Sequence, residues 1–236
     1  MVLMKKEKLK KLLTKVFLKY KLSIAHAKIC SDALVNAELV GATGHGVSRL
    51  KMYCDRIRKK LINPKPKFKF KKISQSVIQI DADDSIGFVA ADIGIKKAIE
   101  SAKKTGIGLV GIKRSGHYGL SGYYAEQAVK KNLLTLIFTN APPAIAPHGA
   151  LKTLFGTNPI CFGTPTSTKV PFILDTSVSM INRGKIRVAA RTGSKIPEGV
   201  ALDKYGRPTT DAAKALKGVQ LPIAGFRGSG LAWMVD

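Results

Sequence analysis

The residues best suited to chemistry lie in the segment GHGVSR, where His45 and Arg49 are four positions apart. This spacing puts both side chains on one face if the helix that follows begins early enough. Imidazole titrates near neutral pH, so His45 could give a proton to a carbonyl oxygen while hydride arrives at carbon. Guanidinium holds a carboxylate through two parallel hydrogen bonds. The pair suits a 2-oxo or 2-hydroxy acid, although such a pattern alone is more often a solvent-facing helix N-terminus.

A second candidate, His117, lies in the glycine-rich segment RSGHYGLSGYYAEQA, between an expected strand and an expected helix. Turns at this place in α/β folds often carry active-site loops, and a turn histidine that caps the helix is an equally good interpretation. The G-x-G-x-x-G motif of a Rossmann fold is absent, because GATGHG and GFRGSG have the wrong order. A P-loop is absent too.

The elements that must position these residues follow from hydrophobic periodicity. Apolar residues at helical spacing predict an amphipathic helix over residues 5–20, a second helix capped by Ser23, and a third helix after Gly46. From Val77 onward strands and helices alternate, which predicts an α/β core. Expected strands are 77–81, 106–112, 133–138, 159–162 and 171–175, expected helices are 88–104 and 119–131, and a long turn-rich stretch with IPEG and GRPTTD follows. We therefore divide the chain into a helical region, residues 1–72, and an α/β core, residues 73–236.

Forty Lys and Arg against 15 Asp and Glu give a net charge of +25, which would ordinarily suggest nucleic acid or an anionic surface. Most of the charge is lysine spread along the whole chain, so we expect no specific nucleic-acid site. The lysines from Lys65 to Lys72 alternate with Phe68 and Phe70, and we favour an edge strand over a surface on which nucleic-acid bases stack.

The separated cysteines Cys30, Cys54 and Cys161 predict buried thiols, and no metal site is expected.

The segments in order resemble the malate/L-lactate dehydrogenase family, which is unrelated to Rossmann-type lactate dehydrogenases. Nearly the whole chain takes part, through GHGVSRL, SGHYGLSGYYAEQA, TNAPPAIAPHGA, LFGTNPICFGTP, PFILDTSVSMINRGKI, IPEGVALDKYGRPTTDAAKAL and LPIAGFRGSGLAWMV. The resemblance implies a non-Rossmann mixed-sheet core that binds NAD or NADP. It also implies hydride transfer between that cofactor and a small 2-oxo or 2-hydroxy acid, in a homodimer.

The resemblance assigns roles residue by residue. His45 matches the family's proton donor, Arg49 the arginine that holds the substrate carboxylate, and His117 a histidine near substrate and nicotinamide. Segments that line the cofactor or substrate are matched by Asn140, Thr157, Asp175, Thr176, Ser177, Val178, Ser179, Phe226 and Arg227.

Several positions depart from the family pattern. Gly44 stands where relatives usually have Ser, Val40 and Thr43 where they have Arg and Asp, and SVSM replaces the usual Ala-Thr-Ser. A missing hydroxyl beside the proton donor leaves its imidazole less well oriented. The alternative hypothesis is therefore a degenerate or noncatalytic family member, with or without nonspecific binding of nucleic acid.

Two further expectations concern the cellular location of the protein and the C-terminal end of the chain. The first 15 residues lack a signal-peptide core, and no stretch approaches the roughly 20 apolar residues of a membrane span, so we expect a cytoplasmic protein. The final GSGLAWMVD predicts a helix capped by Ser229 and shortened soon after its start. Family members continue beyond this point, so we expect a C-terminally shortened core.

Overall fold

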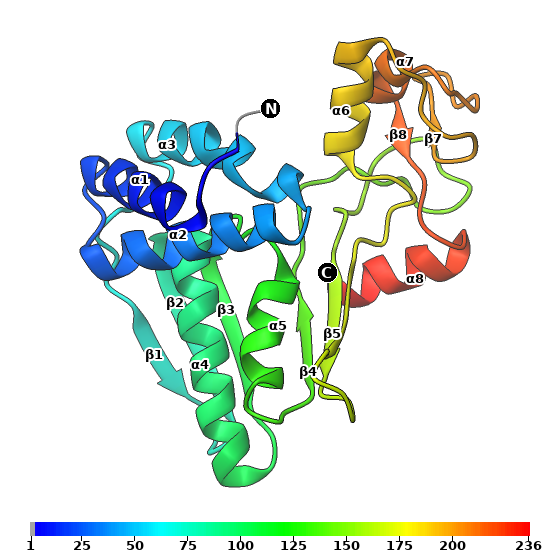
Figure 1. Cartoon of the computed structure of the whole chain (residues 1–236). Coiled ribbons are helices and arrows are strands. Elements are labelled where there is room, and N and C mark those ends of the chain that lie inside the picture. The colour runs from blue at the N-terminus through cyan, green and yellow to red at the C-terminus, as the bar shows by residue number, and fades with distance from the viewer. Residues whose placement is uncertain (1–2) are drawn as a thin grey trace. The chain divides into compact units, whose positions relative to one another are not determined.

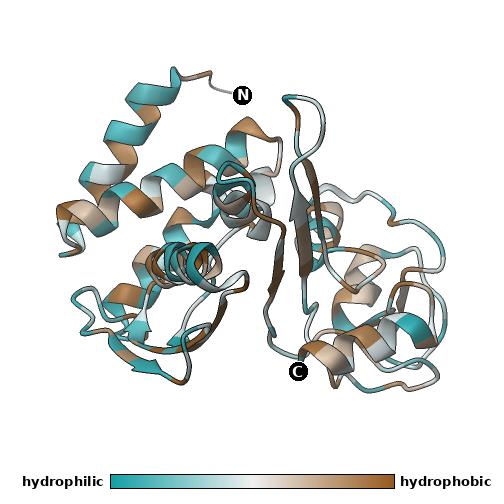
Figure 2. Ribbon diagram, turned by 90° about the horizontal axis from the view of Figure 1, so that it is seen from below, coloured by the Kyte–Doolittle hydropathy of each residue, from teal (hydrophilic) through white to brown (hydrophobic). Residues whose placement is uncertain are grey.

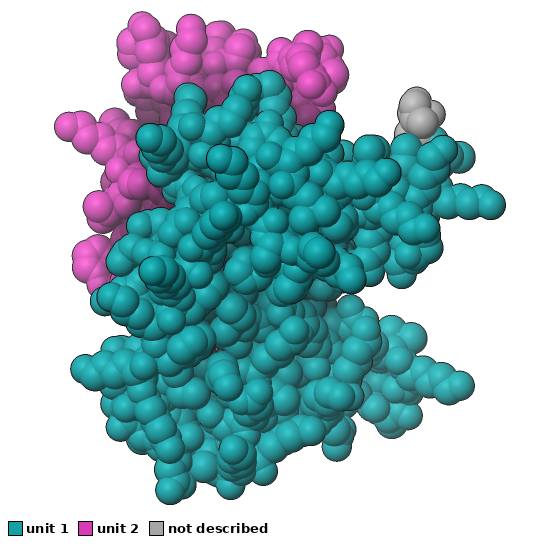
Figure 3. Space-filling model, turned by 90° about the vertical axis from the view of Figure 1, so that its left-hand side faces the viewer, with its two compact units in different colours: residues 1–135, 163–173 teal, residues 136–162, 174–236 magenta. Residues whose placement is uncertain are grey.

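The computed structural model describes residues 3–236, so the first two residues of the N-terminal segment lie outside the description. The chain forms two compact units, which are coloured separately in Figure 3. Unit 1 comprises Met1–Thr135 and Gly163–Ile173, and unit 2 comprises Leu136–Phe162 and Leu174–Asp236. Within residues 3–236, no helix has both the length and the apolarity to cross a membrane.

Unit 1 begins with α1 (Lys6–Lys19), α2 (Ile24–Leu39) and α3 (Leu50–Arg58), which match the three helices expected in this part of the chain (Figure 1). The predicted cap is present, because Ser23 Oγ accepts a hydrogen bond of 3.2 Å from the His26 amide. Polar and apolar residues interleave along these helices in Figure 2. Their apolar faces pack together with the start of α4, and this core includes Leu13, Phe17, Leu34, Tyr53 and Phe88.

The sheet of unit 1 contains β1 (Lys69–Lys72), β2 (Val77–Ser85) and β3 (Leu109–Ser115) in that order. β1 pairs antiparallel with β2, whereas β3 pairs parallel with β2, so the expected α/β class with a mixed sheet is confirmed. Helix α4 (Gly87–Thr105) connects β2 to β3, and α5 (Ser121–Val129) follows β3. β1 is an edge strand with every residue exposed, as predicted for its lysines.

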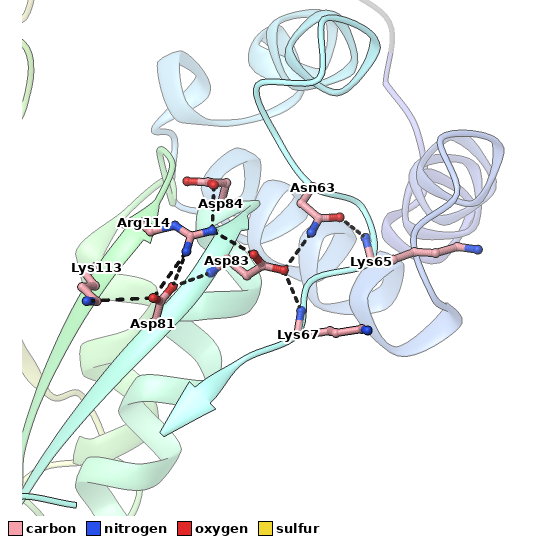
Figure 4. A network of polar contacts seen from close by, with 8 residues as sticks. All are labelled: Asn63, Lys65, Lys67, Asp81, Asp83, Asp84, Lys113 and Arg114. Atoms are coloured by element: carbon pink, nitrogen blue, oxygen red, sulfur yellow. Dashed lines mark hydrogen bonds and ion pairs between the residues drawn. The ribbon is translucent and has the colours of Figure 1, made fainter. Parts of the chain in front are cut away.

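An acidic network holds the ends of β2 and β3 where the loops of the site begin (Figure 4). The register between the strands shifts between Asp81 and Ser85, and Asp83 and Arg114 both have positive φ. Arg114 Nη2 donates to Asp83 Oδ1 at 2.8 Å, and Asp83 Oδ2 accepts from the Lys67 amide at 3.0 Å. The carboxylate of Asp83 therefore joins the segment before β1 to the ends of β2 and β3.

A second sheet contains β4 (Thr135–Phe138), β5 (Ile160–Thr164) and β6 (Phe172–Thr176), in the order β4-β5-β6. The strands predicted at 133–138, 159–162 and 171–175 are thus confirmed with small shifts at their ends. Unit 2 continues with α6 (Arg183–Thr192), β7 (Ala201–Leu202), α7 (Ala212–Lys217), β8 (Val219–Gln220) and α8 (Phe226–Val235).

The turn-rich stretch expected around IPEG and GRPTTD, residues 196–211, is confirmed, and the two-residue strand β7 lies within it. Two helices that were not predicted, α6 and α7, flank this stretch, and their starts are capped by the Asn182 and Asp211 side chains. Both caps, and Gly193 with φ 71° at the end of α6, were readable signals of helix boundaries. The expected cap of the last helix, Ser229, is wrong. Helix α8 begins at Phe226, before Ser229, whose Oγ instead accepts from the His148 amide at 2.8 Å.

The three cysteines are free and buried, as predicted. Burial raises the pKa of the Cys30 and Cys54 thiols and raises the pKa of Cys161 to about 12. At neutral pH the thiols are therefore protonated and behave as small apolar side chains.

Candidate active site

His45 and Arg49 do not share one face of an α-helix, so that expectation is wrong. They lie at the ends of two successive 3₁₀ turns, Thr43–His45 and Val47–Arg49, and α3 begins only at Leu50. The four-residue spacing therefore does not by itself bring the two side chains together.

The break between the two turns has a clear physical cause in Glu38 of α2. Glu38 Oε1 accepts a hydrogen bond of 2.7 Å from the Val47 amide and so caps the second turn. A Cβ at Gly46 would lie 2.1 Å from that oxygen, so a larger residue here would displace the Glu38 carboxylate from its present position. A continuous helix from residue 43 would lose this bond.

Arg49 is anchored to the loop that carries His45. Its Nε donates a hydrogen bond of 2.7 Å to the Gly44 carbonyl oxygen, which fixes the plane of the guanidinium beside the histidine. A Cβ at Gly44 would meet nothing within 4 Å, so a serine would fit at this position. Crowding therefore does not explain why Gly44 replaces the usual serine.

The structure brings His45 and His117 together, although the sequence offered them as two separate candidates. Their rings stack in parallel, with centroids 5.8 Å apart and planes 7° apart. His117 follows β3 and lies against the first residue of α4. A Cβ at Gly87 would be 2.1 Å from the Gly116 carbonyl oxygen and 2.5 Å from that of His117. Glycine at residue 87 therefore permits the close approach that positions His117.

Tyr53 is a residue of this site that sequence reasoning missed. It projects from α3 and is fully buried, with its ring 4.8 Å from that of Phe88. Its Oη lies 2.6 Å from His117 Nδ1. The sequence showed Tyr53 only as an apolar position of the third helix. The signal that could have found it is its hydroxyl, since a buried tyrosine needs a hydrogen-bond partner.

The two histidines have different electrostatic surroundings. Burial, together with the smaller effects of the positive charges of His45, Arg49 and Arg56, lowers the pKa of His117 to about 4. Burial also raises the pKa of Tyr53. At neutral pH His117 is therefore a neutral imidazole beside a protonated phenol, which suits hydrogen bonding more than proton transfer.

The residues matched to cofactor-lining segments all lie in unit 2. The Val178 amide donates to the Thr157 carbonyl oxygen at 2.9 Å, so these two segments are neighbours. Ser177 Oγ and Ser179 Oγ are 3.0 Å apart. Thr176, Ser177 and Ser179 line a pocket of about 410 Å³, and its other polar lining residues are Asn182, Lys185 and Lys195.

The remaining candidates of unit 2 lie on neighbouring loops and on α8. Asn140 precedes Ala141, whose amide donates to Asn158 Oδ1 at 3.0 Å. Asn158 is fully buried and its Nδ2 donates to the Ala232 carbonyl oxygen at 3.0 Å, which ties this loop to α8. Phe226 and Arg227 begin α8, with the guanidinium carbon 5.1 Å from the ring centroid. Asn158 was not among the predicted residues, and its role is structural.

The fold and the paired imidazoles define an α/β protein with the groups required for acid–base chemistry on a carbonyl. Residues 4–236 match the family model described as malate/L-lactate dehydrogenase. The chain belongs to this family. The expected family and its malate/lactate type of oxidoreductase are therefore confirmed.

Similar proteins include the malate/(S)-sulfolactate dehydrogenase of Methanothermus fervidus, 40% identical over 98% of this chain and 68% of that protein. The (2R)-3-sulfolactate dehydrogenase (NADP(+)) of Chromohalobacter salexigens is 38% identical over 89% and 63%. The ureidoglycolate dehydrogenase (NAD(+)) of Escherichia coli O157:H7 is 34% identical over 89% and 60%. The sulfolactate dehydrogenase structure from Methanocaldococcus jannaschii superposes with a TM-score of 0.93 at 40% identity, over 100% of this chain and 68% of that one. The chain thus spans 60–68% of the length of these relatives.

Proposed function

We propose that this chain reduces a small 2-oxo acid to the 2-hydroxy acid, and catalyses the reverse reaction, with a nicotinamide cofactor. The observation that carries the proposal is the stack of His45 on His117 next to the anchored Arg49. A neutral imidazole, a second imidazole and a guanidinium in one loop cluster match the needs of a 2-oxo acid, which presents a carbonyl oxygen next to a carboxylate.

Each side chain has one task in the proposed reaction. Arg49 holds the carboxylate, and His117 lies beside the carbonyl group. The cofactor, when bound, supplies the hydride that adds to the carbonyl carbon. The electron pair of the C=O bond moves to oxygen, and His45 gives that oxygen its proton, so the product is a hydroxyl group and a neutral imidazole. In the reverse direction His45 takes the hydroxyl proton.

The residues of unit 2 fit the binding of a dinucleotide. The pocket beside residues 175–179 offers the hydroxyls of Ser177 and Ser179 together with the ammonium groups of Lys185 and Lys195. Hydroxyls and cations are the donors that phosphate groups need. We therefore propose that Asn140, Thr157, residues 175–179, Phe226 and Arg227 hold the cofactor, and that residues 1–72 carry the proton donor.

Two forms of the nicotinamide cofactor are candidates, since the relatives' names include both NAD(+) and NADP(+). The lysines at residues 185 and 195 make a 2′-phosphate acceptable without requiring it. We therefore propose that the chain uses NAD or NADP, that it is located in the cytoplasm and that it forms a homodimer. Titration with each reduced cofactor, and the mass of the particle in solution, decide between the alternatives.

Replacing His45 by Asn tests the proposed acid. We expect turnover to fall by about two to four orders of magnitude, because general acid catalysis contributes on that scale. Binding of reduced cofactor, followed by its fluorescence, should persist. His26→Asn is the matched control, since His26 belongs to α2 and pairs with Phe68, with ring centroids 6.3 Å apart. Unchanged turnover in His45→Asn would exclude this residue as the acid.

The second candidate function is a noncatalytic basic protein that binds nucleic acid without sequence preference. Gly44 beside the proton donor and the net charge of +25 favour it. Saturable binding of reduced cofactor with turnover of a 2-oxo acid would exclude this function. Tight binding of random duplexes at physiological salt without cofactor binding would support it.

A further inference from the structure

Two hydrogen-bonding groups lie near His117 Nδ1, the Gly119 amide and the Tyr53 hydroxyl, and the amide shows whether the hydroxyl donates or accepts. The Gly119 amide donates to this nitrogen at 3.3 Å, and the Tyr53 hydroxyl lies 2.6 Å from it. A backbone N–H can only donate, so Nδ1 must present its lone pair. It follows that the Tyr53 hydroxyl is also a donor and that the ring proton of neutral His117 is on Nε2.

We propose that Tyr53 is a positioning residue that holds His117 as the Nε2–H tautomer, so that His117 donates a hydrogen bond to the substrate while His45 carries the proton. This inference rests on the proposed function for its substrate. It assigns different tasks to two stacked imidazoles that look equivalent in the sequence.

The surroundings of Tyr53 explain how it can hold one tautomer. Its ring is fully buried and packs on Phe88, so the hydroxyl has little freedom to turn toward another partner. Besides Tyr53, the charged or titratable groups that act on His117 are His45, whose ring is stacked at 5.8 Å, and Arg49 and Arg56. The histidine and the two arginines are cationic or can become so, which disfavours a further positive charge on His117. A neutral His117 in turn leaves His45 able to take up and release a proton.

Nitrogen NMR of histidine rings tests the tautomer without any need for turnover. The chain has four histidines, so protein labelled with ¹⁵N-histidine gives a simple spectrum, and His117→Gln identifies the resonances of this ring. We expect neutral His117 with its proton on Nε2 and with a hydrogen-bonded Nδ1. In Tyr53→Phe the Nδ1 resonance should move toward that of an unbonded nitrogen, and the ring should protonate at higher pH.

Kinetics add a readout that a purely structural role would not change in the same way. Tyr53→Phe should lower kcat for 2-oxo acid reduction by about five- to tenfold, the effect of one hydrogen bond, with the cofactor KM unchanged. Tyr20→Phe is the matched control. It removes a tyrosine hydroxyl that contacts Cys54 of the same helix α3, so the His117 resonances and kcat should both be unchanged.

The outcomes separate this inference from the proposed function. A wild-type His117 that carries its proton on Nδ1, or that is charged at neutral pH, overturns the positioning role even in an active enzyme. An Nδ1 resonance and a kcat that are both unchanged in Tyr53→Phe also overturn it. The predicted resonances in a protein that turns over no 2-oxo acid would support the tautomer assignment and reject the proposed function.

Discussion

Replacing Gly87 by Ala is expected to damage both stability and catalysis, because this glycine separates α4 from the loop of His117. The new Cβ would lie 2.1 Å from the Gly116 carbonyl oxygen and 2.5 Å from that of His117, whereas ordinary contacts begin near 3.4 Å. Both neighbours are backbone atoms that cannot turn away. The helix start or the loop must therefore move by roughly an ångström or more, a shift of the size that separates good from poor packing.

The magnitude follows from two opposing effects. Overpacking costs about 1–3 kcal/mol, and the loss of glycine's freedom in the unfolded chain returns about 0.4–1 kcal/mol. The net loss of about 1–2 kcal/mol corresponds to a Tm lower by about 2–8 °C for a chain of this length. A displacement of about 1 Å of His117 should reduce turnover by about a hundredfold.

Thermal unfolding followed by circular dichroism, with kcat and KM measured on the same preparation, tests this prediction. Gly111→Ala is the control, since Gly111 lies in β3 and a Cβ there would meet nothing within 4 Å. The control should keep the Tm and turnover of the unmodified chain. If Gly87→Ala did so as well, the close approach would not position His117 and the argument would be refuted.

Three further predictions follow from individual side chains. Arg49→Lys should raise the KM for the acid about tenfold, because an ammonium cannot make two parallel bonds to a carboxylate, and a change only in the cofactor KM would place Arg49 elsewhere. Hydrogen bonds lower the pKa of Asp83, and the bond from the Lys67 amide has the largest effect. The ionised carboxylate therefore stabilises the fold fully above the ordinary aspartate pKa, and this stabilisation is lost as the pH falls through the lower pKa of the folded state. Asp83→Asn should therefore lower the Tm most near neutral pH, and equal differences at all pH values down to about pH 2 would contradict this. Replacing Lys67, Lys69 and Lys71 by Gln should leave turnover unchanged, since they lie in or before an exposed edge strand, and a loss of turnover would show that this strand serves catalysis.

Elements whose signals are local were predictable from the sequence. The amphipathic stripe of α1, the Ser23 cap of α2 and the alternation of strands and helices after Val77 each depend on residues within one or two turns of each other. The family resemblance likewise identified His45, Arg49 and His117 as candidates. Helices α6 and α7 were missed although Asn182 and Asp211 marked their starts, because glycine and proline nearby suggested turns.

The arrangement of the site was decided by tertiary contacts. Glu38 from α2 breaks the helix that local spacing suggested for His45 and Arg49, because its carboxylate caps a 3₁₀ turn nine residues away. Tyr53 meets His117 across a core that α3 and α4 share, although the two residues are 64 positions apart. Spacing along a chain specifies which side chains share a face, but a hydrogen bond between distant segments depends on how whole helices and strands pack, and that packing is a property of the complete core.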